Sequence, residues 1–104
     1  MTTALLIVES APVSADVLEE YHRWHELVHI PEMLAVEGIV AARRWEAAAD
    51  SGFLTVYELD VDAETAKANL QAALKSGEMS KPVGVRTDPP PTMRYFTQVR
   101  ESGE

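Results

Sequence analysis

Four short apolar runs, with two segments of helical periodicity between them, constrain the fold of this chain more than any other feature. Residues 3–10 form a β-branched apolar run closed by a proline, which is typical of a buried strand. Residues 39–46 and 53–59 have the same character, and the turn sequence Ala49-Asp50-Ser51-Gly52 between them predicts a hairpin. Residues 92–100 follow a proline-rich stretch and predict the last strand.

The segment between the first two predicted strands has apolar side chains at helical spacing. Residues 17–29 therefore predict an amphipathic helix, with Ser14 or Asp16 available as its N-cap. Pro31 is expected to interrupt this helix, because an internal proline removes a backbone donor and clashes with the preceding turn. A short helical piece then ends at Gly38.

The second helix is predicted to follow Asp62 as its cap and to end at Gly77. The order of elements is then β-α-β-β-α-β, the ferredoxin-like pattern of an α+β domain with a four-stranded antiparallel sheet. With 104 residues there is room for one core only, so we expect a single domain over residues 1–104.

The predicted strands do not alternate cleanly between apolar and polar residues. Leu6 and Val8 fall on one side of the first strand, but Leu5 and Ile7 fall on the other. Two helices cover one face of such a sheet, so the second face also needs cover, and a second copy of the chain is the simplest source. We therefore expect a homodimer in which two sheets form an α/β barrel.

Charge and composition disfavour several classes of partner. The 17 acidic residues against 9 basic ones give a net charge of -8, which repels nucleic-acid backbones and anionic membrane surfaces. The absence of cysteine excludes disulfides and thiolate chemistry and fits a reducing compartment. The apolar run at the start of the sequence is too short for a signal or membrane helix, so a cytoplasmic protein is expected.

The segment His25-Glu26-Leu27-Val28-His29 matches the H-E-x-x-H pattern of zinc metalloproteases. Pro31 follows immediately, however, and no third ligand comes after it at the usual spacing. We therefore expect no metal. His22 is interpreted as solvent-exposed and His25 as a hydrogen-bonded residue at the edge of the core.

His29 differs from these two histidines because it lies where the first helix is expected to break. Its ring would then be held at the mouth of any cavity between helix and sheet. The ordinary pKa of a histidine, about 6.5, suits proton transfer near neutral pH.

Several segments of the first 59 residues together resemble the EthD-like branch of the dimeric α/β barrel superfamily. They are Trp24-x4-His29-Ile30-Pro31-Glu32, Leu34, Gly38, Ala42-Arg43-Arg44-Trp45 and Tyr57-Glu58-Leu59. The resemblance covers residues 4–59 and implies a dimer with a pocket between sheet and helices in each subunit. It departs from the family at Glu37, where relatives tend to have proline. Members include cofactor-free oxygenases, isomerases, polyketide cyclases and haem-handling proteins.

The resemblance also implies candidate pocket residues, namely Trp24, His29, Arg44 and Tyr57. A strand arginine is costly to bury, so Arg44 is expected either to pair with Glu58 or another carboxylate, or to face a ligand anion. Arg43 and Arg44 point to opposite faces of the sheet, so at most one of them lines the pocket.

The function expected from these observations is cofactor-free acid-base catalysis, of isomerase, cyclase or lyase type, on an aromatic, polyketide-like or other carbonyl compound. His29 would move the proton, and Arg44 or Tyr57 would hold the carbonyl or enolate oxygen. Tyr21, Trp24 and His25 would contact the substrate. A non-catalytic ligand-binding or accessory protein with the same pocket is the alternative, and haem handling is a third.

Overall fold

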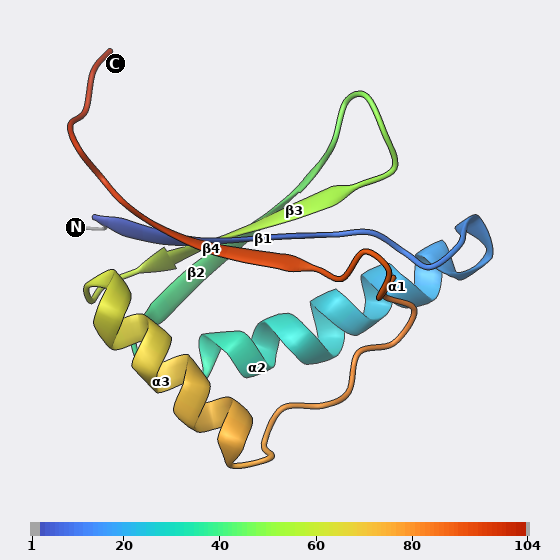
Figure 1. The fold of residues 1–104 in the computed structure, drawn as a ribbon, viewed down its shortest axis with the longest axis horizontal. Coiled ribbons are helices and arrows are strands. Elements are labelled where there is room, and N and C mark those ends of the chain that lie inside the picture. Colours follow the sequence, from blue (N-terminus) through green and yellow to red (C-terminus); the bar gives the residue numbers. More distant parts are fainter. Residues whose placement is uncertain (1–2, 104) are drawn as a thin grey trace.

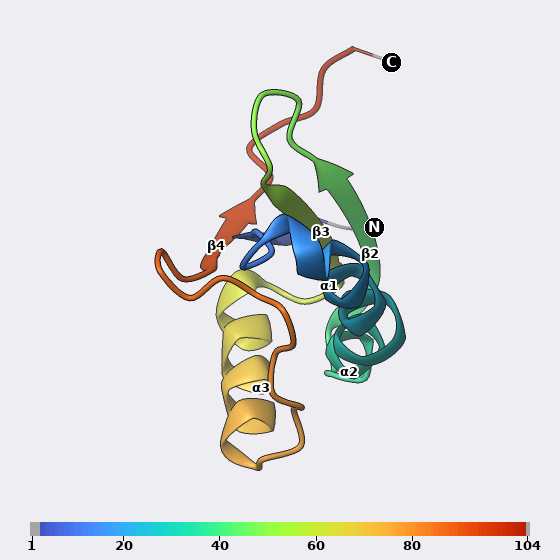
Figure 2. The ribbon, with the colours of Figure 1, turned by 90° about the vertical axis from the view of Figure 1, so that its right-hand side faces the viewer.

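The computed structural model describes residues 3–103 as one antiparallel sheet with all helices on one face (Figures 1 and 2). The strands are ordered β2-β3-β1-β4, so β1 lies between β3 and β4. This is the ferredoxin-like α+β fold predicted from the sequence. The elements are β1 (Ala4–Ser10), η1 (Ala15–Val17), α1 (Leu18–Trp24), η2 (His25–His29), α2 (Ile30–Leu34), β2 (Ile39–Glu46), β3 (Phe53–Leu59), α3 (Ala63–Lys75) and β4 (Thr92–Thr97).

The first helical segment differs from its prediction because Pro31 does not interrupt it. A 3₁₀ turn (η1), an α-helix (α1), a π-helical turn (η2) and a second α-helix (α2) follow one another without a break. His29 and Ile30 both have α-helical backbone angles. Pro31 lies in the first turn of α2, directly after the wider π turn, and the first turn of a helix is where proline is tolerated.

The two helix starts differ in how they are capped. Ser14 has the extended backbone of an N-cap, but its side chain makes no capping hydrogen bond, and Asp16 lies within η1. In α3 the predicted cap is confirmed, since Asp62 Oδ1 accepts a hydrogen bond of 2.7 Å from the backbone N–H of Thr65. Gly77 follows the end of α3 with a φ of 78°, a conformation that favours glycine.

The core lies between the sheet and the α2 and α3 end of the helical layer. It consists of aliphatic side chains together with one tyrosine: Ala4, Leu6, Met33, Val36, Ile39, Tyr57, Leu59, Ala66 and Leu70. Leu6 pairs with Tyr57 and Tyr95 across neighbouring strands, so these three side chains lie on the helix-covered face.

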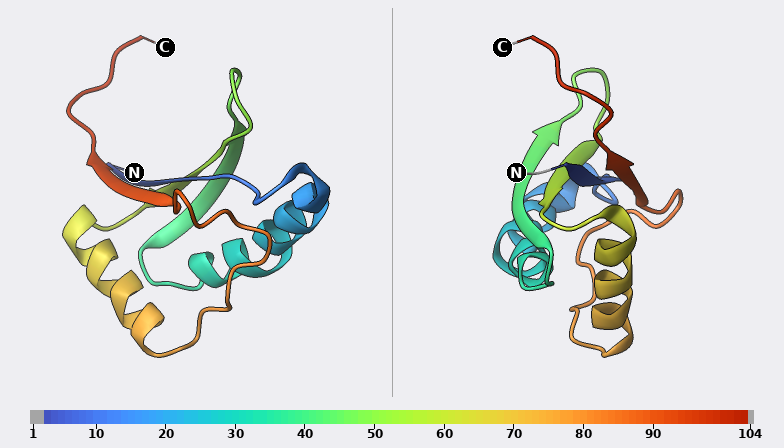
Figure 3. Two further views of the ribbon diagram at one scale, coloured as in Figure 1. Left: turned by 45° about the vertical axis from the view of Figure 1, so that its right-hand side comes forward. Right: turned by 90° about the vertical axis from the view of Figure 1, so that its left-hand side faces the viewer.

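The loop from α3 to β4 returns along the helical layer and is fixed at two places, one on α2 and one on the segment between β1 and η1 (Figure 3). Glu32 of α2 accepts hydrogen bonds from the backbone N–H and the hydroxyl of Ser80. Further along, Pro12 and Val85 form an antiparallel bridge. These contacts fix the course of the loop between α3 and β4.

The opposite sheet face carries no helix. Leu5, Ile7 and Val56 lie half-buried at its centre, and Trp45 and Phe96 are 54% and 36% exposed beside them. This is the apolar second face that the strand pattern predicted. Dimerisation through it stays a prediction.

Candidate functional site

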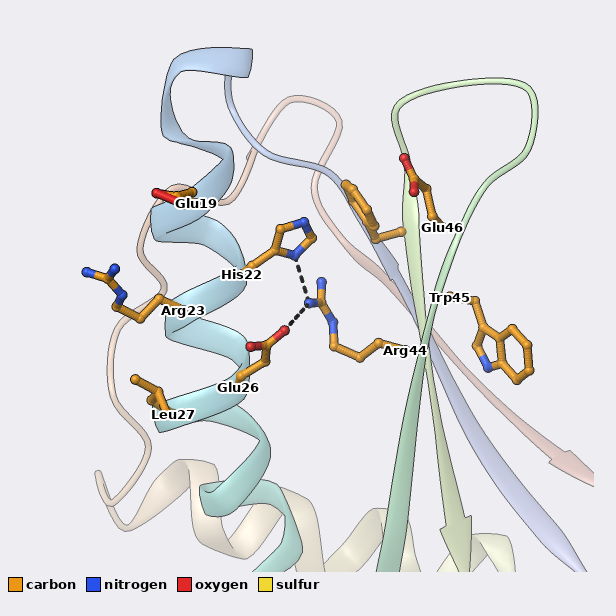
Figure 4. A pocket seen from close by; sticks show the side chains of 9 residues that line it. Glu19, His22, Arg23, Glu26, Leu27, Arg44, Trp45 and Glu46 are labelled. Carbon is orange, nitrogen blue, oxygen red and sulfur yellow. Dashed lines mark hydrogen bonds and ion pairs between the residues drawn. The ribbon is translucent and has the colours of Figure 1, made fainter.

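A cavity of about 520 Å³ lies between α1 and the β2–β3 edge of the sheet (Figure 4). Its lining combines charged side chains with a few aromatic and aliphatic ones: Glu19, His22, Arg23, Glu26, Leu27, Arg44, Trp45, Glu46 and Phe53. Arg44 reaches from β2 toward the helical segment, where His22 of α1 and Glu26 of η2 face it, whereas Trp45 points away from the helix. The volume is within the range of small-molecule sites.

Arg44 is the charged centre of this cavity. Its Nη1 donates a hydrogen bond of 2.8 Å to His22 Nδ1 and lies 3.7 Å from Glu26 Oε2. The guanidinium carbon lies 5.5 Å from the centre of the Tyr21 ring and 5.7 Å from that of Phe53. The side chain is only 15% exposed, so aromatic rings have replaced much of its water.

Two nitrogens of Arg44 have no hydrogen-bond partner in the described part of the chain. Nε and Nη2 are buried, and neither makes a hydrogen bond to any residue that the structure describes. The sequence predicted that Arg44 pairs with Glu58 or another carboxylate or faces a ligand anion. Its ion-pair partner is Glu26, whereas Glu58 pairs with Arg43 on the opposite sheet face. The alternation of Arg43 and Arg44 between the two faces is confirmed.

The hydrogen bond from Arg44 also fixes the tautomer of His22. A guanidinium nitrogen can only donate, so His22 Nδ1 must accept with its lone pair. The ring is then neutral and carries its proton on Nε2. His22 and Arg44 thus present N–H donors from two different elements to one cavity.

A row of aromatic rings continues from this cavity along the inner side of the helical segment. The Tyr21 ring lies 5.4 Å from Phe53 and 4.5 Å from His25, and His25 lies 5.8 Å from His29. Trp24 stacks on His29 with centroids 4.5 Å apart and an angle of 13° between the rings. Residues five apart would diverge on an α-helix, so this stacking depends on the π turn.

Burial keeps two of these histidines neutral. His25 donates its Nδ1 hydrogen to the carbonyl of Tyr21 at 2.8 Å, and burial lowers its pKa to about 4 despite that hydrogen bond. Burial also lowers the pKa of His29, although the nearby Glu32 carboxylate opposes the shift. His29 Nδ1 is buried and unpartnered within residues 3–103.

Tyr57 belongs to the core more than to the cavity. It is almost fully buried on the helix-covered face, where it pairs with Leu6 and Ala42. Burial raises the pKa of its hydroxyl, and the charge of Arg44 acts in the opposite direction. The side chain therefore stays protonated and can act only as a neutral donor or acceptor.

The predicted site residues thus fall into two groups. Arg44 lines the cavity and Tyr21 contacts Arg44 directly, whereas Trp24, His25, His29 and Tyr57 do not line it. His22, interpreted as exposed, is partly buried and binds Arg44. The sequence indicated this role of His22 only through its spacing from Glu26: the two residues lie one helical turn apart, and both face Arg44.

The H-E-x-x-H segment lies entirely within η2, so its two histidines are held by a π turn instead of an α-helix. Over residues 3–103, no group of three or more histidine, aspartate or glutamate side chains is arranged to hold a metal ion. In the same part of the chain, no helix is long and apolar enough to cross a membrane.

Comparison with known proteins yields a likeness in fold alone. No protein-family model matches the chain, and no curated protein matches its sequence. Among solved structures, it is similar to a monooxygenase from the gene ActVA-Orf6 of Streptomyces coelicolor, crystallised with the ligand nanaomycin D. The TM-score is 0.67 with 11% sequence identity, over 99% of this chain and 93% of the other. This likeness supports the ferredoxin-like fold and does not distinguish the EthD-like branch.

Proposed function

We propose that this protein binds and acts on a small, planar, polyketide-like carbonyl compound in the cavity between α1 and the β2–β3 edge. The observation that carries the proposal is Arg44, whose Nε and Nη2 are buried without partners among the residues described. A buried N–H group without an acceptor is unfavourable, and a guanidinium group is more so because of its charge. A ligand oxygen in the cavity would satisfy these donors.

The walls of the cavity suit an aromatic ligand. Phe53 and Leu27 supply apolar surface beside the charged groups, and flat aromatic compounds stack on such side chains. The structural neighbour of the same fold was crystallised with nanaomycin D, which supports a ligand of this class as the first to test.

The chemistry that we propose begins with the removal of a proton next to a carbonyl group. The C–H bond of the substrate breaks, its electron pair forms a C=C bond, the C=O π pair moves onto the carbonyl oxygen, and the proton passes to a basic side chain. Arg44 and the Nε2–H of His22 would donate hydrogen bonds to the resulting oxyanion. This step needs no cofactor, and it is common to isomerases, cyclases and lyases.

His29 remains our proposed proton acceptor. Its neutral ring and its buried Nδ1, which has no partner among the described residues, are compatible with this role. Because His29 does not line the cavity and lies at the far end of the aromatic row from Arg44, this role requires a ligand that extends along that row. A binding protein without turnover would use the same Arg44 contacts, so turnover itself has to be measured.

The proposal is tested by titrating the protein with chrysophanol, a methylated dihydroxyanthraquinone, and following tryptophan fluorescence. We expect Arg44→Met to weaken binding about 10-fold or more, because a charged donor is removed. Arg43→Met is the matched control, since its side chain lies on the other sheet face. Equal affinities for the wild type and Arg44→Met would contradict the proposed site.

We further propose that the protein is a cytoplasmic homodimer of the EthD-like branch, with the uncovered sheet faces packed together. The exposed Trp45 and Phe96 on that face support this assembly, because they extend an apolar centre formed by Leu5 and Ile7. Light scattering at micromolar concentration should give twice the chain mass of 11.5 kDa. A stable monomer at that concentration would exclude the dimer.

A further inference from the structure

A second cavity of about 520 Å³ lies beside the β2–β3 hairpin, against the end of β1 and the loop that precedes β4. Three residues line both cavities, namely Trp45, Glu46 and Phe53. A ligand that extends past Phe53 from the first cavity would therefore enter the second.

Arg86 is the basic residue of this second cavity, and its backbone is fixed to the end of β1. The backbone N–H of Arg86 donates a hydrogen bond of 2.8 Å to the carbonyl of Ala11. The backbone N–H of Val13 donates another of 2.8 Å to the carbonyl of Gly84. These bonds flank the bridge between Pro12 and Val85. The loop therefore holds Arg86 at a defined place in the cavity wall.

The guanidinium group of Arg86, like that of Arg44, has a buried nitrogen without a hydrogen-bond partner among the described residues. Its Nε is buried and unpartnered, and its side chain forms no ion pair with any residue between 3 and 103. A planar guanidinium group matches the two oxygens of a carboxylate.

Three carboxylates also line the cavity, and they decide what kind of anion can bind. Asp50 accepts a hydrogen bond of 2.8 Å from the N–H of Gly52, and Glu9 and Glu46 lie on the strands nearby. None of them pairs with Arg86. Together with the net charge of -8 they repel small free anions. An anion should therefore bind here only when it is attached to a larger body held by other contacts.

We propose that Arg86 forms a second subsite that binds a carboxylate at the far end of the aromatic compound whose carbonyl oxygen contacts Arg44. The inference rests on the proposed function and narrows its substrate class to aromatic carbonyl compounds with a remote carboxylate. Phe53 lies between the two subsites and supports the aromatic body of the ligand.

The test compares two dihydroxyanthraquinones that differ at one position, rhein with a carboxylate and chrysophanol with a methyl group. We expect the wild type to bind rhein about 10-fold more tightly than chrysophanol in fluorescence titrations. Arg86→Met should abolish this preference and leave the affinity for chrysophanol unchanged. Arg86→Lys should retain part of it, and circular dichroism checks that both variants fold.

The outcomes separate this subsite from the proposed function. If Arg86→Met weakens both probes equally, or if the wild type shows no preference for rhein, the Arg86 subsite is wrong while the loss of binding in Arg44→Met still supports the first cavity. If neither probe binds, the aromatic ligand class is wrong, and the Arg86 subsite, which rests on it, is wrong as well.

Discussion

The two ends of the helix-covered sheet face are built from different kinds of side chain. At the α3 end, Leu59, Leu70 and Met33 are almost fully buried among other aliphatic groups. At the α1 end, His25 and Arg44 take the corresponding places beneath the helix, and Nε and Nη2 of Arg44 have no partner within the described chain.

This difference separates stability from function within one small domain. The aliphatic end buries apolar surface without exposing polar groups to a low dielectric, which stabilises the fold. The histidine and arginine end bears the desolvation cost of buried polar groups, and a ligand can offset part of that cost. We therefore expect substitutions at the two ends to affect different measurements.

The largest effect is expected at the α3 end. Leu59→Ala removes a fully buried side chain from the core and should lower the free energy of unfolding by about 3 kcal/mol. Urea unfolding measures this loss, and the folded fraction should still bind chrysophanol. Leu74→Ala on α3 is the control, because that leucine is 53% exposed and its loss should cost less than about 1 kcal/mol. Similar losses in both variants would mean that the core is elsewhere.

The second-largest effect is expected on the catalytic rate, with little change in binding or stability. If His29 moves the proton, His29→Ala should lower the rate about 100-fold with any hydroxyquinone that the wild type converts, while binding changes little. Fold and stability should be retained, because His29 lies outside the aliphatic core. A lower melting temperature with unchanged turnover in the folded fraction would instead assign His29 a structural role.

The third effect concerns the dependence of stability on pH. His25 has a folded pKa of about 4 against 6.5 for a free side chain, so the unfolded chain binds more protons between these two values. Stability should therefore fall as the pH drops from about 7.5 to 5, and His25 should account for about 2 kcal/mol of that loss. His25→Phe should remove this part of the slope in urea unfolding. A slope identical to that of the wild type would show that His25 is hydrated and not buried.

The sequence predicted the sheet well because strand signals are local. The bounds of β2 and β3 agree with the apolar runs 39–46 and 53–59, and the Asp62 cap of α3 follows from one side chain and one backbone donor. The predicted interruption of the helix at Pro31 was wrong, because a π turn can place a proline within the first turn of the next helix.

The candidate site was only partly predictable for a related reason. Strand alternation predicted that Arg43 and Arg44 face opposite sides of the sheet, and only the family resemblance favoured Arg44 as the pocket residue. Its partner His22 depends on how α1 packs against β2, which no local pattern records. The stacking of Trp24 on His29 depends on the same π turn. Arg86 gave no signal at all, since its position is set by backbone hydrogen bonds between distant segments.

The most direct test of the central claim uses two neighbouring arginines as reporter and control. Arg43 and Arg44 are adjacent in β2, yet one pairs with Glu58 on the uncovered face and the other lines the cavity. NMR spectra of the arginine Nε–H groups, recorded during a titration with chrysophanol, report on both at once. The account predicts that the Arg44 signal shifts to saturation while the Arg43 signal stays in place. A shift of Arg43 alone, or of neither signal, would contradict it.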